Sequence, residues 1–176
     1  LETLVELLRP GDVVTHAFTG HPHGVLGDSG KVIPSIMEAQ ARGVIFDIGH
    51  GQGSFSFDVA EKALSHDFYP NNISSDLHVY NIGGPVFDQI SVLSKFIWMG
   101  MSVSDVIRLS TNATAQIMGL DDRLGTLCVG SEADVTLLRF DEGRFIFTDA
   151  FGRSVTSRKK LNHVKTIKGG LIYQPN

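Results

Sequence analysis

Residues 44–53 read Val-Ile-Phe-Asp-Ile-Gly-His-Gly-Gln-Gly. The first five form a nearly continuous apolar run, which is typical of a parallel strand covered on both of its faces. The glycines that follow allow a sharp turn at the carboxyl end of that strand, and His50 lies in this turn. Parallel α/β proteins carry their chemistry at this end of the strands. The stretch therefore predicts a parallel α/β fold with a functional group at residue 50.

The same order of strand, loop and helix occurs on both sides of this stretch. Val13 to His16 reads as a short strand before it, and Ile73 to Asp76 as a weaker strand after it. Helices are expected at residues 1–8, 33–42, 55–64, 88–99, 103–109 and 113–118. Strand and helix alternating about every thirty residues indicate a parallel sheet or barrel.

The character of the chain changes near Gly119. Beyond it, glycines separate short β-prone runs at residues 135–140, 145–148, 164–167 and 171–173. These runs predict a small β unit. We therefore expect two parts, an α/β part at residues 1–120 and a β segment at residues 121–176.

Composition narrows the class of protein. The chain is 42% hydrophobic and 19% charged, which is typical of a globular protein. A net charge of -4 argues against a dedicated nucleic-acid binder, which needs a basic patch. No apolar run approaches the ~18 residues that indicate a membrane span. Residues 1–9 lack a signal-peptide pattern, and the single cysteine, Cys128, excludes an intrachain disulfide and a cysteine-built zinc site. We expect a cytoplasmic protein.

Three polar residues fall at the carboxyl ends of the expected strands: His16, His50 and Asp76. They are 34 and 26 residues apart, so each follows the last by about one strand–helix unit. Strand ends converge in a closing barrel, and two imidazoles with a carboxylate suit a divalent metal, zinc most readily. The carboxylate could also accept a proton from a metal-bound water. The alternative is that all three are loop residues hydrogen-bonded to backbone.

The segments around these residues resemble a known family. Val14-Thr-His-Ala-Phe, Phe46-Asp-Ile-Gly-His-Gly and Ser74-Ser-Asp-Leu-His are similar to the amidohydrolase superfamily, especially its dihydroorotase-like amidohydrolase and deacetylase metallohydrolases. Residues 111–120 and 125–135 are similar to the region where that superfamily's chain leaves its barrel and joins a β-sandwich. The resemblance extends over nearly the whole chain, with its segments in the expected order.

The resemblance implies a distorted (β/α)8 barrel of the TIM type that binds one or two zinc ions or another divalent metal. His16 would close the fifth strand and His50 the sixth, and both would bind the second metal. Asp76 would end the last barrel strand, bind the first metal, and carry a proton to the leaving group as the catalytic base. Since the sequence between His50 and Asp76 leaves no room for a separate seventh unit, these strand numbers are open by one.

Part of the family's ligand set has no counterpart here. The first-strand His-x-His and the fourth-strand lysine are missing, and His21-Pro22-His23 follows the strand of His16, so we expect it in a surface loop. A whole barrel needs about 250 residues. The chain therefore resembles the C-terminal part of the barrel followed by a β-sandwich segment. Its expected partner is the missing N-terminal half or another copy in a homo-oligomer. Residues 44–48 would be partly uncovered without that partner.

The resemblance implies a zinc-dependent hydrolase that acts on an amide or ester of a small polar acid, with deacetylation preferred. His78 is expected to contact this small-molecule substrate. The loop with Asn81 and Gly83 is expected to hold its carboxylate. Two alternatives stay open: a cyclic-amide hydrolase of the dihydroorotase type, and a non-catalytic half-barrel. Neither a nucleic-acid nor a membrane partner is expected.

Overall fold

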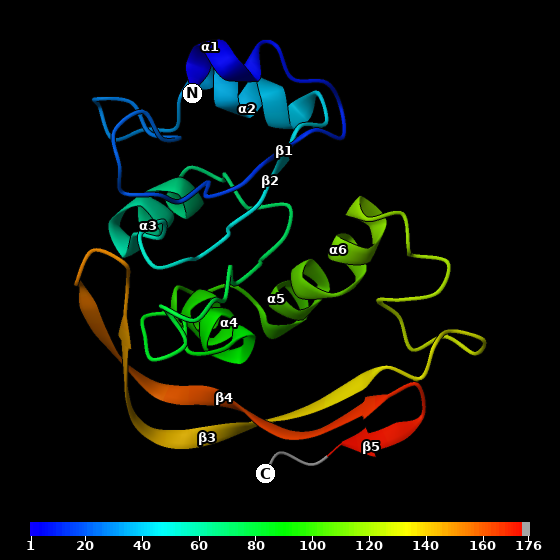
Figure 1. Cartoon of the computed structure of the whole chain (residues 1–176). Helices are drawn as coiled ribbons and strands as arrows, with labels where there is room; N and C mark the ends of the chain where they lie inside the picture. Colours follow the sequence, from blue (N-terminus) through cyan, green and yellow to red (C-terminus); the bar gives the residue numbers. More distant parts are fainter. Residues whose placement is uncertain (174–176) are drawn as a thin grey trace.

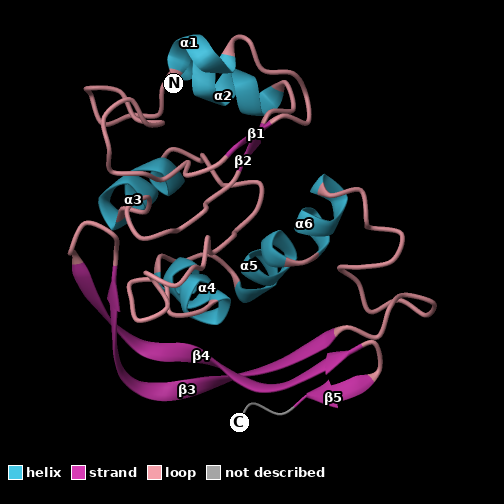
Figure 2. Ribbon diagram, viewed as in Figure 1, coloured by secondary structure: helices cyan, strands magenta, loops and turns pink. Residues whose placement is uncertain are grey.

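The structure, a computed structural model, describes residues 1–173 and combines a layered α/β part with an antiparallel sheet (Figures 1 and 2). The helices are α1 (Glu2–Val5), α2 (Pro34–Ala41), α3 (Phe57–Ser65), α4 (Gln89–Trp98), α5 (Val103–Ser110) and α6 (Asn112–Ile117). The strands are β1 (Val13–Val14), β2 (Ile45–Phe46), β3 (Val135–Thr148), β4 (Ser154–Lys168) and β5 (Leu171–Tyr173). The predicted α/β class is confirmed. Among the described residues, no helix is both long enough and apolar enough to cross a membrane.

The parallel strands lie in chain order. β1 pairs in parallel with β2, and Asp47, directly after β2, forms a parallel bridge with Asn72. The backbone NH of Gly51 then donates to the carbonyl of Ser75, which continues the contact toward Asp76. The expected strand at residues 73–76 does not form, and only Asn72 of this segment makes a bridge. The segment that leads to Asp76 is still the direct neighbour of β2.

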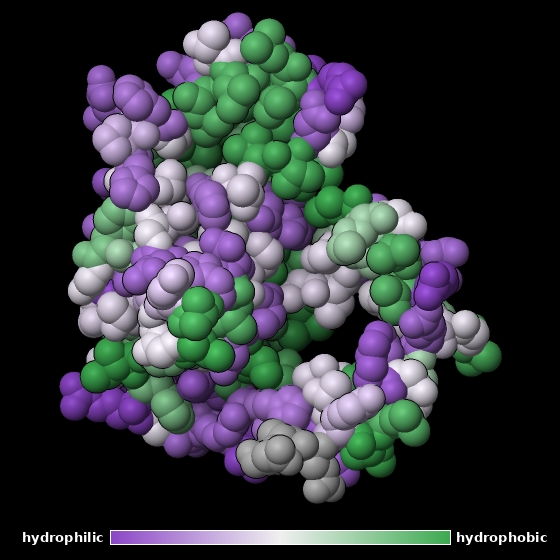
Figure 3. Space-filling view, viewed as in Figure 1, coloured by the Kyte–Doolittle hydropathy of each residue, from purple (hydrophilic) through white to green (hydrophobic). Residues whose placement is uncertain are grey.

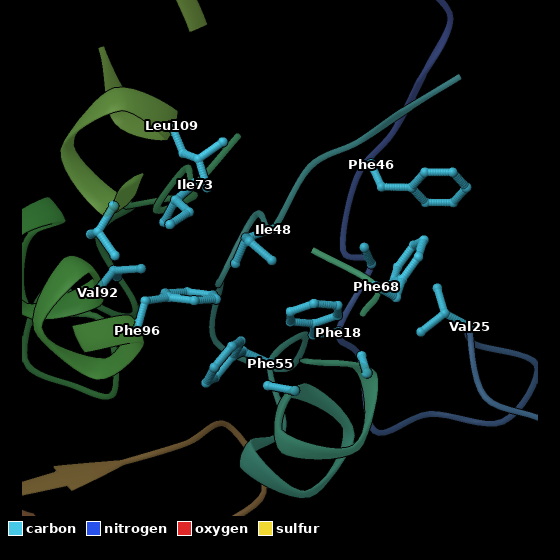
Figure 4. Packing of buried hydrophobic residues seen from close by; sticks show 14 of the residues in the cluster. Phe18, Val25, Phe46, Ile48, Phe55, Phe68, Ile73, Val92, Phe96 and Leu109 are labelled. Atoms are coloured by element: carbon cyan, nitrogen blue, oxygen red, sulfur yellow. The ribbon is translucent and has the colours of Figure 1, made fainter. Parts of the chain in front are cut away.

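A cluster of aromatic side chains fills the space between these strands and the helices (Figure 4). Phe46 of β2 packs edge-on against Phe68, with ring centroids 5.2 Å apart, and Phe68 also meets Phe18 at 6.3 Å. The expectation that residues 44–48 are partly uncovered is wrong for Val44, Phe46 and Ile48, which are at most 1% exposed. Side chains of this chain, Phe68 among them, bury the run.

Apolar side chains are instead exposed around β1. Leu4 and Leu7 of the N-terminal turn, Val13 of β1 and Met37 of α2 all remain accessible, Leu7 to 78%. Figure 3 shows an apolar area over the part of the molecule that contains α1 and α2. Exposed apolar side chains therefore lie in the N-terminal part of the chain and, as Val79 and Ile82 show, in the loop beyond Asp76, but not over β2.

The C-terminal sheet joins β3, β4 and β5 in antiparallel order. β3 unites two runs that the sequence pattern separates at Gly143, because the register shift between Glu142 and Phe145 absorbs the glycine within one strand. α4 packs on β4 (Figure 1), where the backbone NH of Leu161 donates to Ser94 Oγ. The sheet therefore rests on a helix of the α/β part.

Candidate functional site

The three predicted ligands follow three adjacent segments, two of which are strands. His16 comes after β1, His50 after β2, and Asp76 after the segment that bridges at Asn72. The backbone of residues 49–51, called here the glycine loop, is held on this last segment. The NH of His50 donates to the carbonyl of Ser74 at 3.3 Å, and the NH of Gly51 donates to Ser75 at 3.1 Å.

Glycine is favoured on both sides of His50. A Cβ at Gly49 would lie 2.8 Å from His16 Nδ1, and a Cβ at Gly51 would lie 2.7 Å from Asp76 Oδ2. Both glycines also have positive φ angles, 45° and 55°, which disfavour other residues. The missing side chains leave room for the His16 ring at the Gly49 end of the loop and for the Asp76 carboxylate at the Gly51 end.

His16 has the tautomer that a metal ligand needs. Its Nδ1 lies 2.7 Å from the carbonyl oxygen of Gly49, and a carbonyl can only accept, so Nδ1 carries the proton. Nε2 is left with its lone pair on a half-buried ring. Metal-ligating histidines are commonly oriented by this kind of bond from the other nitrogen. His16 therefore fits a metal.

Asp76 also fits a ligand or a proton acceptor. Its side chain is exposed, with Oδ2 against the space that Gly51 leaves open. Its backbone has a φ of 48° and is fixed by Asn81 Nδ2, which donates to the Asp76 carbonyl at 2.8 Å. The backbone that carries the carboxylate is thus held in place, and the residue is open to solvent.

His50 is different, because both of its ring nitrogens already have partners. Nδ1 lies 2.9 Å from the carbonyl oxygen of Gly51, and Nε2 lies 2.7 Å from Lys95 Nζ. The ring is 0% exposed and stacks on Phe55 with centroids 4.5 Å apart. Burial, and then the charge of Lys95, lower the pKa of His50 to about 3. In this arrangement the imidazole is neutral and offers no free lone pair to a metal.

The sequence pattern missed Lys95, which is 1% exposed in the middle of α4. Its Nζ lies 2.8 Å from the carbonyl oxygens of Pro85 and Thr148, in addition to His50 Nε2. These three acceptors match the three protons of an ammonium group. Burial lowers the pKa of Lys95 to about 7, and the charge of Asp149 opposes this shift. A lysine flanked by apolar and small residues within one helix was the available signal.

Asp47 was also missed. Its buried carboxylate accepts from Thr15 Oγ1 at 2.7 Å and from Ser74 Oγ at 2.9 Å, so it joins all three strand segments. Within residues 1–173 its Oδ1 has no hydrogen-bond partner. A charged residue inside the apolar run of residues 44–48 was the signal for it.

The residues predicted to contact substrate differ in their exposure to solvent. Asn81 is buried, and its Oδ1 accepts from the backbone NH of His78 at 2.8 Å, so its amide shapes the loop. His78 and Gly83 are exposed on that loop. His21 and His23 are exposed as expected of a surface loop, with His21 edge-on to Phe151.

The described part of the chain offers too few side chains at one place to bind a metal ion. Within residues 1–173, no group of three or more His, Cys, Asp or Glu side chains is arranged to hold a metal ion. His16 and Asp76 therefore meet the chemical requirements of ligands, but they do not form a complete set by themselves.

Relatives were found by sequence. The profile of the Amidohydrolase family matches residues 92–173. A deacetylase of Enterococcus faecalis is 35% identical over 175 residues, which are 98% of this chain and 47% of that protein. A deacetylase of Agrobacterium fabrum is 34% identical over 160 residues, 91% of this chain and 39% of that protein. The chain thus spans about half the length, or less, of these curated relatives.

Solved structures agree with the sequence matches. The crystal structure of an adenine deaminase superposes with a TM-score of 0.95 at 34% identity, over 99% of this chain and 48% of that one. The crystal structure of a dihydroorotase gives a TM-score of 0.88 at 31% identity, over 97% and 46% of the two chains. The predicted resemblance is confirmed, and the chain belongs to the amidohydrolase superfamily.

Proposed function

We propose that the chain forms part of a metal-dependent hydrolase that cleaves an amide or ester bond of a small polar acid, with deacetylation as the preferred reaction. The observation that carries the proposal is the pair of His16 and Asp76, which lie against the two ends of the glycine loop. The names of the curated relatives support deacetylation.

In this proposal, residues 1–120 are a portion of a (β/α)8 barrel and residues 121–176 a segment of a β-sandwich. Asp76 ends the last barrel strand. Because β2 is the direct neighbour of the segment before Asp76, β2 becomes the seventh strand and β1 the sixth. The fifth and sixth positions expected for His16 and His50 thus move by one, and no separate unit between His50 and Asp76 is needed.

His16 and Asp76 are the proposed metal ligands, through Nε2 and the carboxylate. A divalent ion such as Zn²⁺, when bound, supplies Lewis acidity that activates water and polarises an acyl oxygen. Asp76 is the proposed proton carrier, since an exposed carboxylate can accept a proton from water and deliver it to a leaving group. His50, expected as a third ligand, does not fit that role here because Lys95 and Gly51 occupy its ring nitrogens.

The remaining ligands must come from a partner segment or a second copy. The exposed apolar side chains of Leu4, Leu7 and Val13 support the N-terminal part of the chain as the place where the partner docks. The exposed loop of His78 and Gly83 is the proposed contact for the substrate's polar groups.

The test is a chimera in which this chain replaces the matched region of the E. faecalis deacetylase. With Zn²⁺ added, we expect release of acetate from N-acetyl or O-acetyl small acids, and only background release by the 176-residue chain alone. Asp76→Asn in the chimera should abolish turnover. A folded, zinc-loaded chimera whose Asp76→Asn form is fully active would contradict the proposal.

A second candidate is a cyclic-amide hydrolase, favoured by the TM-score of 0.88 with the dihydroorotase structure. Cyclic amides in the same assay distinguish the two reactions. Ring opening without acetate release would replace deacetylation by this alternative.

A further inference from the structure

Lys95 and His50 lie on the inner side of the glycine loop and have no part in the proposed chemistry. Their contact of 2.7 Å joins α4 to the loop. We propose that this pair, called here the buried clamp, fixes the glycine loop between His16 and Asp76. His50 is then a positioning residue and not a metal ligand. The inference rests on the proposed function only in taking His16 and Asp76 as the ligands.

The clamp is anchored from three directions. Lys95 Nζ reaches the carbonyl of Pro85 in the loop beyond Asp76 and the carbonyl of Thr148 at the end of β3. His50 reaches the loop itself through Gly51 and stacks on Phe55. Lys95 Nζ therefore joins three parts of the molecule at one atom: the glycine loop, the loop beyond Asp76 and the C-terminal sheet.

The clamp acts on the outer side of the loop through the backbone. The backbone carbonyl of Gly49, one residue before His50, accepts a hydrogen bond from His16 Nδ1. Gly51, one residue after His50, lies against Asp76 Oδ2. A displacement of His50 moves both neighbours. It therefore changes the bond that sets the His16 tautomer and the space available to Asp76.

A ligand role for His50 would disrupt this arrangement. A metal at Nε2 would have to displace the buried Lys95 ammonium, which would leave the carbonyls of half-buried Pro85 and Thr148 without their donor. Unpaired buried acceptors and displaced buried charges are both costly. The geometry thus favours the ammonium over a metal at this nitrogen.

The deciding experiment follows the histidine ring nitrogens and the backbone amides by NMR of uniformly ¹⁵N-labelled 176-residue protein titrated with Zn²⁺. We expect His50 to show a protonated Nδ1 and an unprotonated, hydrogen-bonded Nε2, with no change as Zn²⁺ is added. The ring signals of His16 should move. If the His50 Nε2 signal instead moves to the chemical shift of a zinc-bound nitrogen, the clamp is overturned and the metal proposal stands.

Lys95→Met removes the ammonium and keeps the stem, and Lys62→Met on the exposed side of α3 is the matched control. We expect Lys95→Met to shift the His50 Nε2 signal and the Gly51 amide, and to weaken zinc binding at His16 by about 10- to 100-fold. Lys95→Arg should restore part of the affinity. Unchanged His50 and Gly51 signals in a folded Lys95→Met protein would overturn the clamp.

The two proposals fail differently. If Zn²⁺ moves no His16 signal even in the chimera, where the remaining ligands are present, while Lys95→Met still shifts His50 and Gly51, the metal assignment fails and the clamp remains. If Lys95→Met does not fold, the zinc titration of the unaltered protein still decides whether His50 is a ligand.

Discussion

The two sides of the glycine loop present opposite environments. On the outer side, His16 is half-buried with a free Nε2 and Asp76 is exposed. On the inner side, His50 and Lys95 are buried, and each donor or acceptor of their side chains meets a protein partner. Histidines at equivalent strand ends thus differ in the one property that metal binding needs, an available lone pair. Position after a strand is not sufficient, because the direction of the side chain decides.

The largest expected effect that separates the two sides is on stability. Lys95→Met leaves three acceptors without a donor, one on buried His50 and two on half-buried Pro85 and Thr148, and a buried group of this kind costs about 1–3 kcal/mol. The free energy of unfolding measured in urea should fall by several kcal/mol, whereas Lys62→Met should change it by less than about 0.5 kcal/mol. Equal urea midpoints for the two variants would remove the distinction between the inner and outer sides.

A smaller effect is expected at the loop itself. Gly51→Ala combines a positive φ with a Cβ 2.7 Å from Asp76 Oδ2, so the free energy of unfolding should fall by about 1–3 kcal/mol. Gly119→Ala is the matched control, because its φ is 66° and no atom lies within 4 Å of the added Cβ. The difference between the two variants measures the contact with Asp76. If it is zero, the carboxylate does not lie against the loop.

Acid should weaken the inner side through His50. Its pKa is about 3 in the folded protein and near 6.5 when unfolded, so between these values the unfolded chain binds more protons. Stability is therefore lost as pH falls through this window, by up to about 1.4 kcal/mol per pH unit from this group. Urea unfolding at several pH values measures the slope. His50→Asn should flatten it, and an unchanged slope would mean that the imidazole is accessible to protons.

The smallest effect on stability belongs to the outer side. Asp76→Asn changes an exposed carboxylate, so the free energy of unfolding should stay within about 0.5 kcal/mol of the original. Thermal and urea unfolding both report on it. A loss comparable with that of Lys95→Met would show that Asp76 is part of the packed interior.

Much of the fold follows from local patterns. The apolar run around Phe46 and the glycine that ends it predict a buried strand followed by a turn, and the structure has both. The helices lie within a few residues of their expected places, because apolar periodicity and capping residues act over short distances. The expectation that Gly143 separates two strands is wrong. A glycine is as typical of a bulge as of a turn, and pairing with β4 makes this position a bulge within β3.

The site is less predictable for a physical reason. Spacing along the chain shows that His50 follows a strand, but two left-handed glycines determine where its ring points. Lys95 finds its acceptors 10, 45 and 53 positions away in the sequence. Only tertiary packing brings such groups together, so the helical pattern around Lys95 could not reveal them.

The bond from Lys95 to Thr148 has a consequence for how this sequence can diverge. The acceptor is a backbone carbonyl, so residue 148 can change without losing the contact as long as β3 keeps its path. The same holds for Pro85, whose carbonyl takes the second proton. Sequence covariation between the C-terminal sheet and the glycine loop should therefore be weak, even though Lys95 joins them. The constraint should appear only at positions 50 and 95, as a pair that changes together or not at all.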